Sequence, residues 1–256
     1  MYISVKGNGP PMVLIHGWGM AGSIWTEISK SLSKKFELHI LDLPGMGKSG
    51  LIEPYSIDEI VDQIYLNTPN NSIILGWSMG GQISIKLAVK YSYFIKNLIL
   101  ISTTPCFIQK KGWNCAVDDE NFANFASQLT KNRKKTMLNF LALQLLGSEG
   151  SHKIINNLKR NFIDNENENY NGLIPALNLL RSTDLRTLVP KVKIPTLIIS
   201  GCKDKLTPSE ASLWMQKRIK NSKIENIETA SHIPFISNKN DVLNLISNFL
   251  ETGNGR

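Results

Sequence analysis

Short apolar runs alternate with helical patterns at both ends of this 256-residue chain. The runs typical of buried strands are residues 12–15, 37–41, 72–75, 96–101, 195–200 and 223–227. The segments that predict helices are residues 23–32, 57–65, 81–91, 209–219 and 241–250. Strands that are apolar throughout and alternate with helices indicate an α/β fold, with a mostly parallel central sheet and helices on both faces.

The middle of the chain has a different pattern. Between Cys106 and Asp184 there is no clear strand, and helical patterns are joined by segments rich in asparagine and lysine. A helical insertion into an otherwise continuous α/β domain accounts for this change. We therefore expect a core formed by residues 1–105 and 185–256, with a helical lid formed by residues 106–184.

One motif lies between a predicted strand and a predicted helix. Gly76-Trp77-Ser78-Met79-Gly80 matches G-x-S-x-G, the pattern of a nucleophile elbow. The bare pattern often occurs by chance, and a structural glycine-rich turn is the alternative. The strand before it and the helix after it are the context that an elbow requires, so we predict that Ser78 is a nucleophile.

A serine hydroxyl is a weak nucleophile at neutral pH and needs a general base. In proteins with this elbow, an acid and then a histidine follow the serine, each on a loop after a strand. Asp204 and His232 each follow one of the last two predicted strands. Asp184 precedes a strand and Asp42 comes too early in the chain, so both are weaker candidates. We predict a catalytic triad of Ser78, His232 and Asp204.

A second motif, His16-Gly17-Trp18-Gly19, directly follows the first predicted strand. Acyl transfer requires two N–H donors aimed at the developing oxyanion. In proteins with this elbow, one donor follows the nucleophile and the other lies on this early loop. Met79 and Trp18 are the residues at those positions. A plain strand-to-helix turn would explain the glycines alone.

These residues, in this order, resemble the α/β-hydrolase superfamily over nearly the whole chain. A closer resemblance is to the pimeloyl-[acyl-carrier protein] methyl ester esterases of biotin synthesis. The stretches that carry it are residues 16–20, 76–81, 140–144 and 230–237. The most discriminating is Phe140-Leu141-Ala142-Leu143-Gln144, because it lies in the predicted lid, outside the shared catalytic core.

The resemblance implies a serine carboxylesterase that hydrolyses the methyl ester of a pimeloyl group carried on acyl carrier protein. It also implies that the acyl site is lined by Trp18, Ser78, Met79, Phe140, Leu141, Ala142, Leu143, Gln144 and His232. Packing of the lid against the core is an equal explanation for any single apolar residue of the lid stretch. A general short-acyl carboxylesterase, a carbon–carbon bond hydrolase and a ligand receptor of the same fold are the alternatives.

Charge adds a candidate partner. The chain carries a formal net charge of +8, and between residues 131 and 160 there are seven basic residues and one acidic residue. The basic residues are Lys131, Arg133, Lys134, Lys135, Lys153, Lys159 and Arg160. A local basic patch beside a substrate entrance would attract an acidic carrier protein, whereas a solvated helix face is the plainer explanation. No nucleic-acid-binding motif accompanies these residues.

The remaining composition narrows the setting. Hydrophobic residues make up 42% and charged residues 20%, which is typical of a globular protein. The three cysteines match no metal-ligand spacing, and the turn at residues 45–49 lacks the spacing of a phosphate-binding loop. We expect a cytoplasmic monomer that uses no metal and no cofactor, without a membrane-spanning segment.

Overall fold

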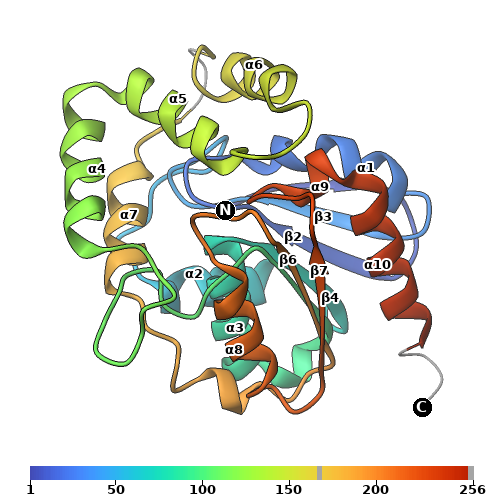
Figure 1. Ribbon diagram of the computed structural model, residues 1–256. Coiled ribbons are helices and arrows are strands. Elements are labelled where there is room, and N and C mark those ends of the chain that lie inside the picture. The colour runs from blue at the N-terminus through green and yellow to red at the C-terminus, as the bar shows by residue number, and fades with distance from the viewer. Residues whose placement is uncertain (166–168, 253–256) are drawn as a thin grey trace.

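The computed structural model describes residues 1–165 and 169–252. Its centre is a sheet in the order β1-β3-β2-β4-β5-β6-β7 (Figure 1). The strands are β1 (Tyr2–Lys6), β2 (Pro11–Ile15), β3 (Glu37–Asp42), β4 (Ser72–Trp77), β5 (Ile95–Ile101), β6 (Thr196–Gly201) and β7 (Ser222–Ile227). All neighbouring pairs are parallel except β1 with β3. The sequence-based prediction of a mostly parallel sheet is confirmed, and its six strands are all present.

Strand β1 is the strand that the sequence analysis missed. Its residues alternate weakly between polar and apolar, and both Tyr2 and Val5 are exposed. An antiparallel edge strand needs one covered face only, so it lacks the continuous apolar run by which the parallel strands were recognised. β1 covers the edge of β3, with Tyr2 paired to Asp42.

Helices cover both faces of the sheet (Figure 1). On one face α1 (Thr26–Leu32) packs against α10 (Lys239–Thr252), with the short α9 (Pro234–Ser237) beside them. On the other face α2 (Ile57–Asn67) packs against α3 (Met79–Lys90), and α8 (Ser209–Gln216) lies on β6 and β7. Every residue of β4 and of β6 is buried between these layers.

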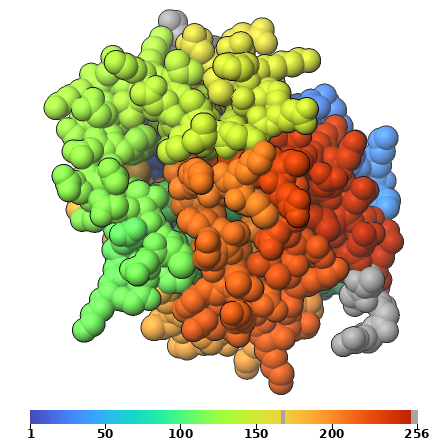
Figure 2. All heavy atoms as spheres, in the orientation of Figure 1, coloured from blue at the N-terminus to red at the C-terminus, as the bar shows by residue number. Residues whose placement is uncertain are grey.

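Four further helices lie between β5 and β6 in the chain: α4 (Asp119–Lys131), α5 (Arg133–Gln144), α6 (Ser151–Phe162) and α7 (Leu173–Ser182). In Figure 1 α5 and α6 lie above the sheet and α4 and α7 lie along its left side, and in Figure 2 the green and yellow atoms of this region border the core at the left and top. No helix in the described part of the chain is both long enough and apolar enough to cross a bilayer.

The strand order determines where a site can form. From β2 the chain moves to β3 on one side, and it then returns to β4 on the other side of β2. Ligands of open α/β sheets bind at the carboxyl ends of the strands where the order reverses in this way. The loops that follow β2 and β4 therefore meet beneath the four helices.

Candidate active site

Ser78 lies at the turn between β4 and α3, with φ of 56° and ψ of −120°. Few residues other than glycine adopt a positive φ, and such strained backbone is concentrated at functional sites. The neighbouring β5 holds the turn, because Ser78 N–H donates to the carbonyl of Ile101 at 3.0 Å. The hydroxyl of Thr103 donates to the Ser78 carbonyl at 2.6 Å.

The glycines on either side of Ser78 are required by close packing. A Cβ on Gly76 would collide with the hydroxyl of Ser84, and a Cβ on Gly80 would collide with the carbonyl of Ile15. The motif is therefore explained by the approach of α3 and of β2 to the turn. Met79 is the first residue of α3, so its N–H has no acceptor within the helix.

His232 and Asp204 reach Ser78 from the loops after β7 and β6. His232 Nε2 lies 3.0 Å from Ser78 Oγ, and His232 Nδ1 lies 2.7 Å from Asp204 Oδ2. The side chains of His232 and Asp204 are 1% and 0% exposed. The Asp204 carboxylate accepts a hydrogen bond from Nδ1–H, which leaves Nε2 free to accept the proton of the Ser78 hydroxyl. The three residues predicted to act together are brought into one hydrogen-bonded chain.

The backbone of His232 is held from two directions. Its N–H donates to the carbonyl of Gln144 at 3.0 Å, and its carbonyl accepts from the indole of Trp77 at 2.8 Å. Nearby, Lys203 Nζ donates to the carbonyl of Gly147 at 2.9 Å. Gln144 and Gly147 lie at the end of α5 and just beyond it, so this segment is tied to both loops that carry the acid and the histidine.

The loop after β2 packs directly against the nucleophile. A Cβ on Gly17 would lie only 3.0 Å from Ser78 Cβ. His16 Nε2 accepts the N–H of Leu43 at 2.9 Å, and Nδ1 donates to the carbonyl of Gly17 at 2.7 Å. Burial lowers the pKa of His16 below its ordinary 6.5, because desolvation disfavours the charged ring. His16 thus shapes the loop as a neutral side chain.

Trp18 connects this loop to the four helices. Its indole N–H donates to the carbonyl of Leu173 at 2.9 Å. Its ring meets Phe125 and Phe140 edge-on, at centroid distances of 5.5 and 5.2 Å. Trp18 also lines an apolar cavity of about 270 Å³. The other residues that line it are Phe107, Val117, Asn121, Phe122, Phe125, Phe140, Leu143, Leu177, Leu180 and Leu206.

Some residues of the stretch 140–144 face the cavity or His232, and others do not. Phe140 and Leu143 line the cavity, and the carbonyl of Gln144 contacts His232. Leu141 is buried in the hydrophobic core, whereas Ala142 is exposed. One helix presents different residues to different surroundings, so a continuous five-residue stretch does not form one wall.

Most of the cavity wall was missed by the sequence analysis. It comes from the segment after β5, from α4 and α7, and from Leu206 near Asp204. Phe122 and Phe125 carried a usable signal, because residues three apart on a helix lie on the same side. That side could not be assigned to a cavity before the partner surfaces were known.

The seven basic residues are spread over three helices. Lys131 ends α4, three lie in the first turn of α5, and three lie on α6. Two of them are engaged: the Arg133 guanidinium stacks 3.7 Å above the Tyr170 ring, and Lys159 lies 3.6 Å from Asp164. Lys153 and Arg160 line a separate groove between α6 and α1.

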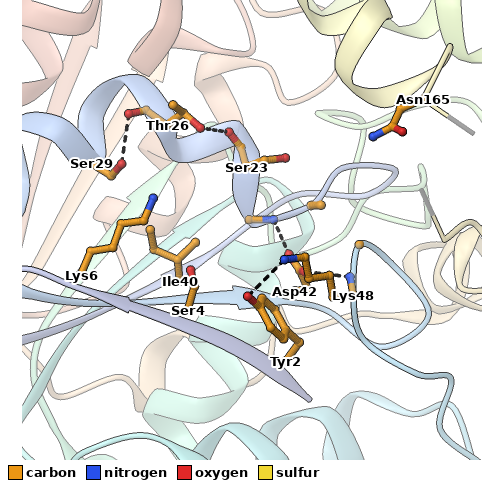
Figure 3. A pocket seen from close by; sticks show the side chains of 13 residues that line it. Tyr2, Ser4, Lys6, Ser23, Thr26, Ser29, Ile40, Asp42, Lys48 and Asn165 are labelled. Carbon is orange, nitrogen blue, oxygen red and sulfur yellow. Dashed lines mark hydrogen bonds between the residues drawn. The ribbon is translucent and has the colours of Figure 1, made fainter. Parts of the chain in front are cut away.

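Asp184 and Asp42, the two weaker candidates for the acid of the triad, form hydrogen bonds with other groups. Asp184 pairs with Arg186 through two hydrogen bonds of 2.9 and 2.7 Å. This pairing holds the pKa of Asp184 below its ordinary range. Asp42 accepts the backbone N–H groups of Gly22 and Lys48 beside a surface hollow of about 400 Å³ (Figure 3). Neither carboxylate forms a hydrogen bond with His232.

Comparison with known proteins agrees with this geometry. Residues 10–239 match the family described as alpha/beta hydrolase fold. The pimeloyl-[acyl-carrier protein] methyl ester esterase of Nitrosomonas europaea is 32% identical, over 93% of this chain and 94% of its own. The protein of the same name from Wigglesworthia glossinidia brevipalpis is 35% identical, over 95% of this chain and 94% of its own.

Solved structures share the fold. An esterase from Exiguobacterium antarcticum superposes with a TM-score of 0.88 at 24% identity, covering 97% of this chain and 94% of its own. A bromoperoxidase from Bacillus anthracis has the same TM-score at 23% identity, covering 98% and 95%. The chain belongs to the α/β-hydrolase family and, within it, to the family of pimeloyl-[acyl-carrier protein] methyl ester esterases.

Proposed function

We propose that this chain hydrolyses the methyl ester of pimeloyl-[acyl-carrier protein], giving pimeloyl-[acyl-carrier protein] and methanol in biotin biosynthesis. The observation that carries the proposal is the hydrogen-bonded chain from Ser78 through His232 to Asp204, next to a loop that opens onto an apolar cavity. The relatives that span nearly the whole chain bear the name of this activity.

Acylation begins when Ser78 Oγ attacks the ester carbonyl while His232 Nε2 takes the hydroxyl proton. The N–H groups of Trp18 and Met79 donate to the oxyanion of the tetrahedral intermediate. His232 then gives its proton to the departing methoxide, which leaves as methanol, and an acyl ester remains on Ser78. Asp204 stabilises the imidazolium that exists between these two transfers.

Deacylation repeats the sequence with water as the nucleophile. His232 Nε2 takes a proton from the water as its oxygen attacks the acyl carbonyl. The same histidine returns the proton to Ser78 Oγ as the acyl–oxygen bond breaks. The pimeloyl carboxylate leaves, still attached to its carrier through the other end of the chain.

We also propose that residues 106–184 act as a lid over this site, with 1–105 and 185–256 as the core. The methylene chain of the substrate would lie in the cavity among Trp18, Phe140 and Leu143, because burial of apolar surface favours that position. The carrier would remain outside the apolar space.

The carrier is the proposed partner, attracted by the basic residues of α4, α5 and α6. These basic residues would increase the rate at which the acidic carrier associates with the chain, and added salt would reduce that increase. Free thiols at Cys106, Cys115 and Cys202 suit a reducing compartment, and we place the reaction in the cytoplasm.

The test is incubation of the purified chain with the methyl ester of pimeloyl-[acyl-carrier protein], followed by mass spectrometry of the carrier. The expected result is a mass loss of one methylene unit, absent with Ser78→Ala. Cleavage of short aryl esters with the carrier ester left intact would instead establish a general carboxylesterase. Cleavage of a dienoate diketone would point to a carbon–carbon hydrolase, and binding without turnover to a receptor.

A further inference from the structure

The carboxylate of Asp204 is enclosed by donors from its own turn. Oδ1 accepts the N–H groups of Leu206 and Thr207, at 2.8 and 3.0 Å. Oδ2 accepts the Thr207 hydroxyl at 2.6 Å and His232 Nδ1 at 2.7 Å. Both Asp204 and Thr207 are buried, so these hydrogen bonds take the place of water around the charge.

The Thr207 hydroxyl and the histidine ring meet on the same oxygen. Thr207 Oγ1 lies 3.4 Å from His232 Nδ1, and each of the two groups donates a hydrogen bond to Asp204 Oδ2. The hydroxyl therefore approaches the carboxylate from a second direction. Together with the two backbone N–H groups that donate to Oδ1, it opposes rotation of the Asp204 carboxylate.

We propose that Thr207 is a positioning residue of the triad: its hydroxyl fixes the Asp204 carboxylate so that Oδ2 faces the imidazole of His232. The inference rests on the proposed function, because it assumes that the histidine acts as the base for Ser78. Thr207 does not touch the reacting atoms and acts through Asp204 alone.

A purely structural role for a buried threonine is the competing explanation, and the chain contains a matched control. Thr196, the first residue of β6, is also fully buried, and its hydroxyl donates to the carbonyl of Ile194 at 2.7 Å. It lies at the opposite end of the strand that leads to Asp204. Loss of its hydroxyl removes a comparable buried hydrogen bond without altering the triad.

The experiment measures kcat and KM on a short aryl ester for Thr207→Val, Thr207→Ser and Thr196→Val. Hydrogen bonds to charged groups are among the stronger ones in proteins, so we expect Thr207→Val to lower kcat about ten- to thirty-fold. KM should stay within about two-fold, because the ester does not contact Thr207. Thr207→Ser keeps the hydroxyl and should restore kcat to within about three-fold of the parent.

Thr196→Val should lower the urea midpoint of unfolding and leave kcat unchanged. The downfield proton resonance of His232 Nδ1–H should move or broaden in Thr207→Val and be retained in Thr207→Ser. A folded Thr207→Val with parental kcat would overturn the inference, as would a Thr207→Ser as slow as Thr207→Val. Ser78→Ala distinguishes failure of the role of Thr207 from failure of the proposed function, because the proposed function would fail if Ser78→Ala remained active.

Discussion

The core and the four helices above it are built by different rules. β4 and β6 are buried along their whole length between two layers of helices. In contrast, α4 buries only Phe122 and Leu129, and α6 only Leu158 and Phe162. Ser78 and Asp204 follow these doubly covered strands and His232 follows the edge strand β7, whereas the cavity wall comes largely from singly covered helices. In this protein, the residues of the hydrogen-bonded chain and most residues of the cavity wall therefore come from different segments.

The largest expected difference between the core and the four helices is in catalysis, and it is tested by removing the Ser78 hydroxyl. We expect Ser78→Ala to lower kcat by about 10⁶-fold on both carrier-linked and short esters, because members of a triad act as a unit. Phe140→Ala, on α5, should cost about ten-fold, mainly through KM. Steady-state kinetics on both esters measures this, with circular dichroism as a check on folding. Comparable losses in the two variants would remove the distinction.

Stability should separate the regions in the same way. Leu75 is completely buried in β4, whereas Leu146, after α5, is 55% exposed. Leu75→Ala should lower the free energy of unfolding by about 2–5 kcal/mol, since it leaves a cavity in packed surroundings. Leu146→Ala should change it by no more than about 0.5 kcal/mol. Urea titrations of both variants supply the comparison, and equal shifts would show that the helices are packed as tightly as the sheet.

Charge reversal tests whether the helices select the substrate. Lys134→Glu with Lys135→Glu should lower kcat/KM for the carrier-linked ester about ten-fold at low salt, through loss of electrostatic steering. The same variant should process a short ester normally. Lys191→Glu with Lys193→Glu, at exposed positions of the core before β6, is the matched control and should affect neither ester. An equal loss with both pairs would show that net charge alone matters.

The last prediction concerns His16 in the core and the pH dependence of stability. Its pKa is lowered in the folded state, so below pH 6.5 the unfolded chain binds more protons than the folded chain. The free energy of unfolding should therefore fall as the pH drops from 7 to 5, at up to about 1.4 kcal/mol per pH unit. Urea midpoints at both pH values measure the slope. His16→Gln should flatten it, and an unchanged slope would assign the effect to other groups.

How well each region could be predicted from the sequence depends on whether its elements are buried on one face or on both. Strands β2 to β6 could be located from sequence because burial on both faces demands nearly uninterrupted apolar residues. Ser78 and Asp204 could be located because each follows such a strand, and His232 because it follows the last strand, β7, in the expected order. β1 was not predicted because an edge strand does not need a continuous apolar run. Its apolar residue Val5 is exposed and gives no sign of a buried strand.

The cavity could not be predicted to the same depth, because a helix pattern does not reveal which partner covers each side. Leu141 and Leu143 have the same chemistry, yet one lies in the core and the other lines the cavity. The role of Thr207 depends on the conformation of a turn, which brings its hydroxyl onto Asp204. The carbonyl of Gln144 reaches His232 through tertiary packing, and no side-chain pattern encodes that contact.

The hydrogen bonds from His232 N–H to the Gln144 carbonyl and from Lys203 to the Gly147 carbonyl have a consequence for turnover. Moving the end of α5 away would leave the His232 N–H unpaired, so this contact opposes movement of α5 at this point. An arriving ester thus meets a base that is already oriented, and the entropy of aligning that base has been lost during folding rather than in each catalytic cycle.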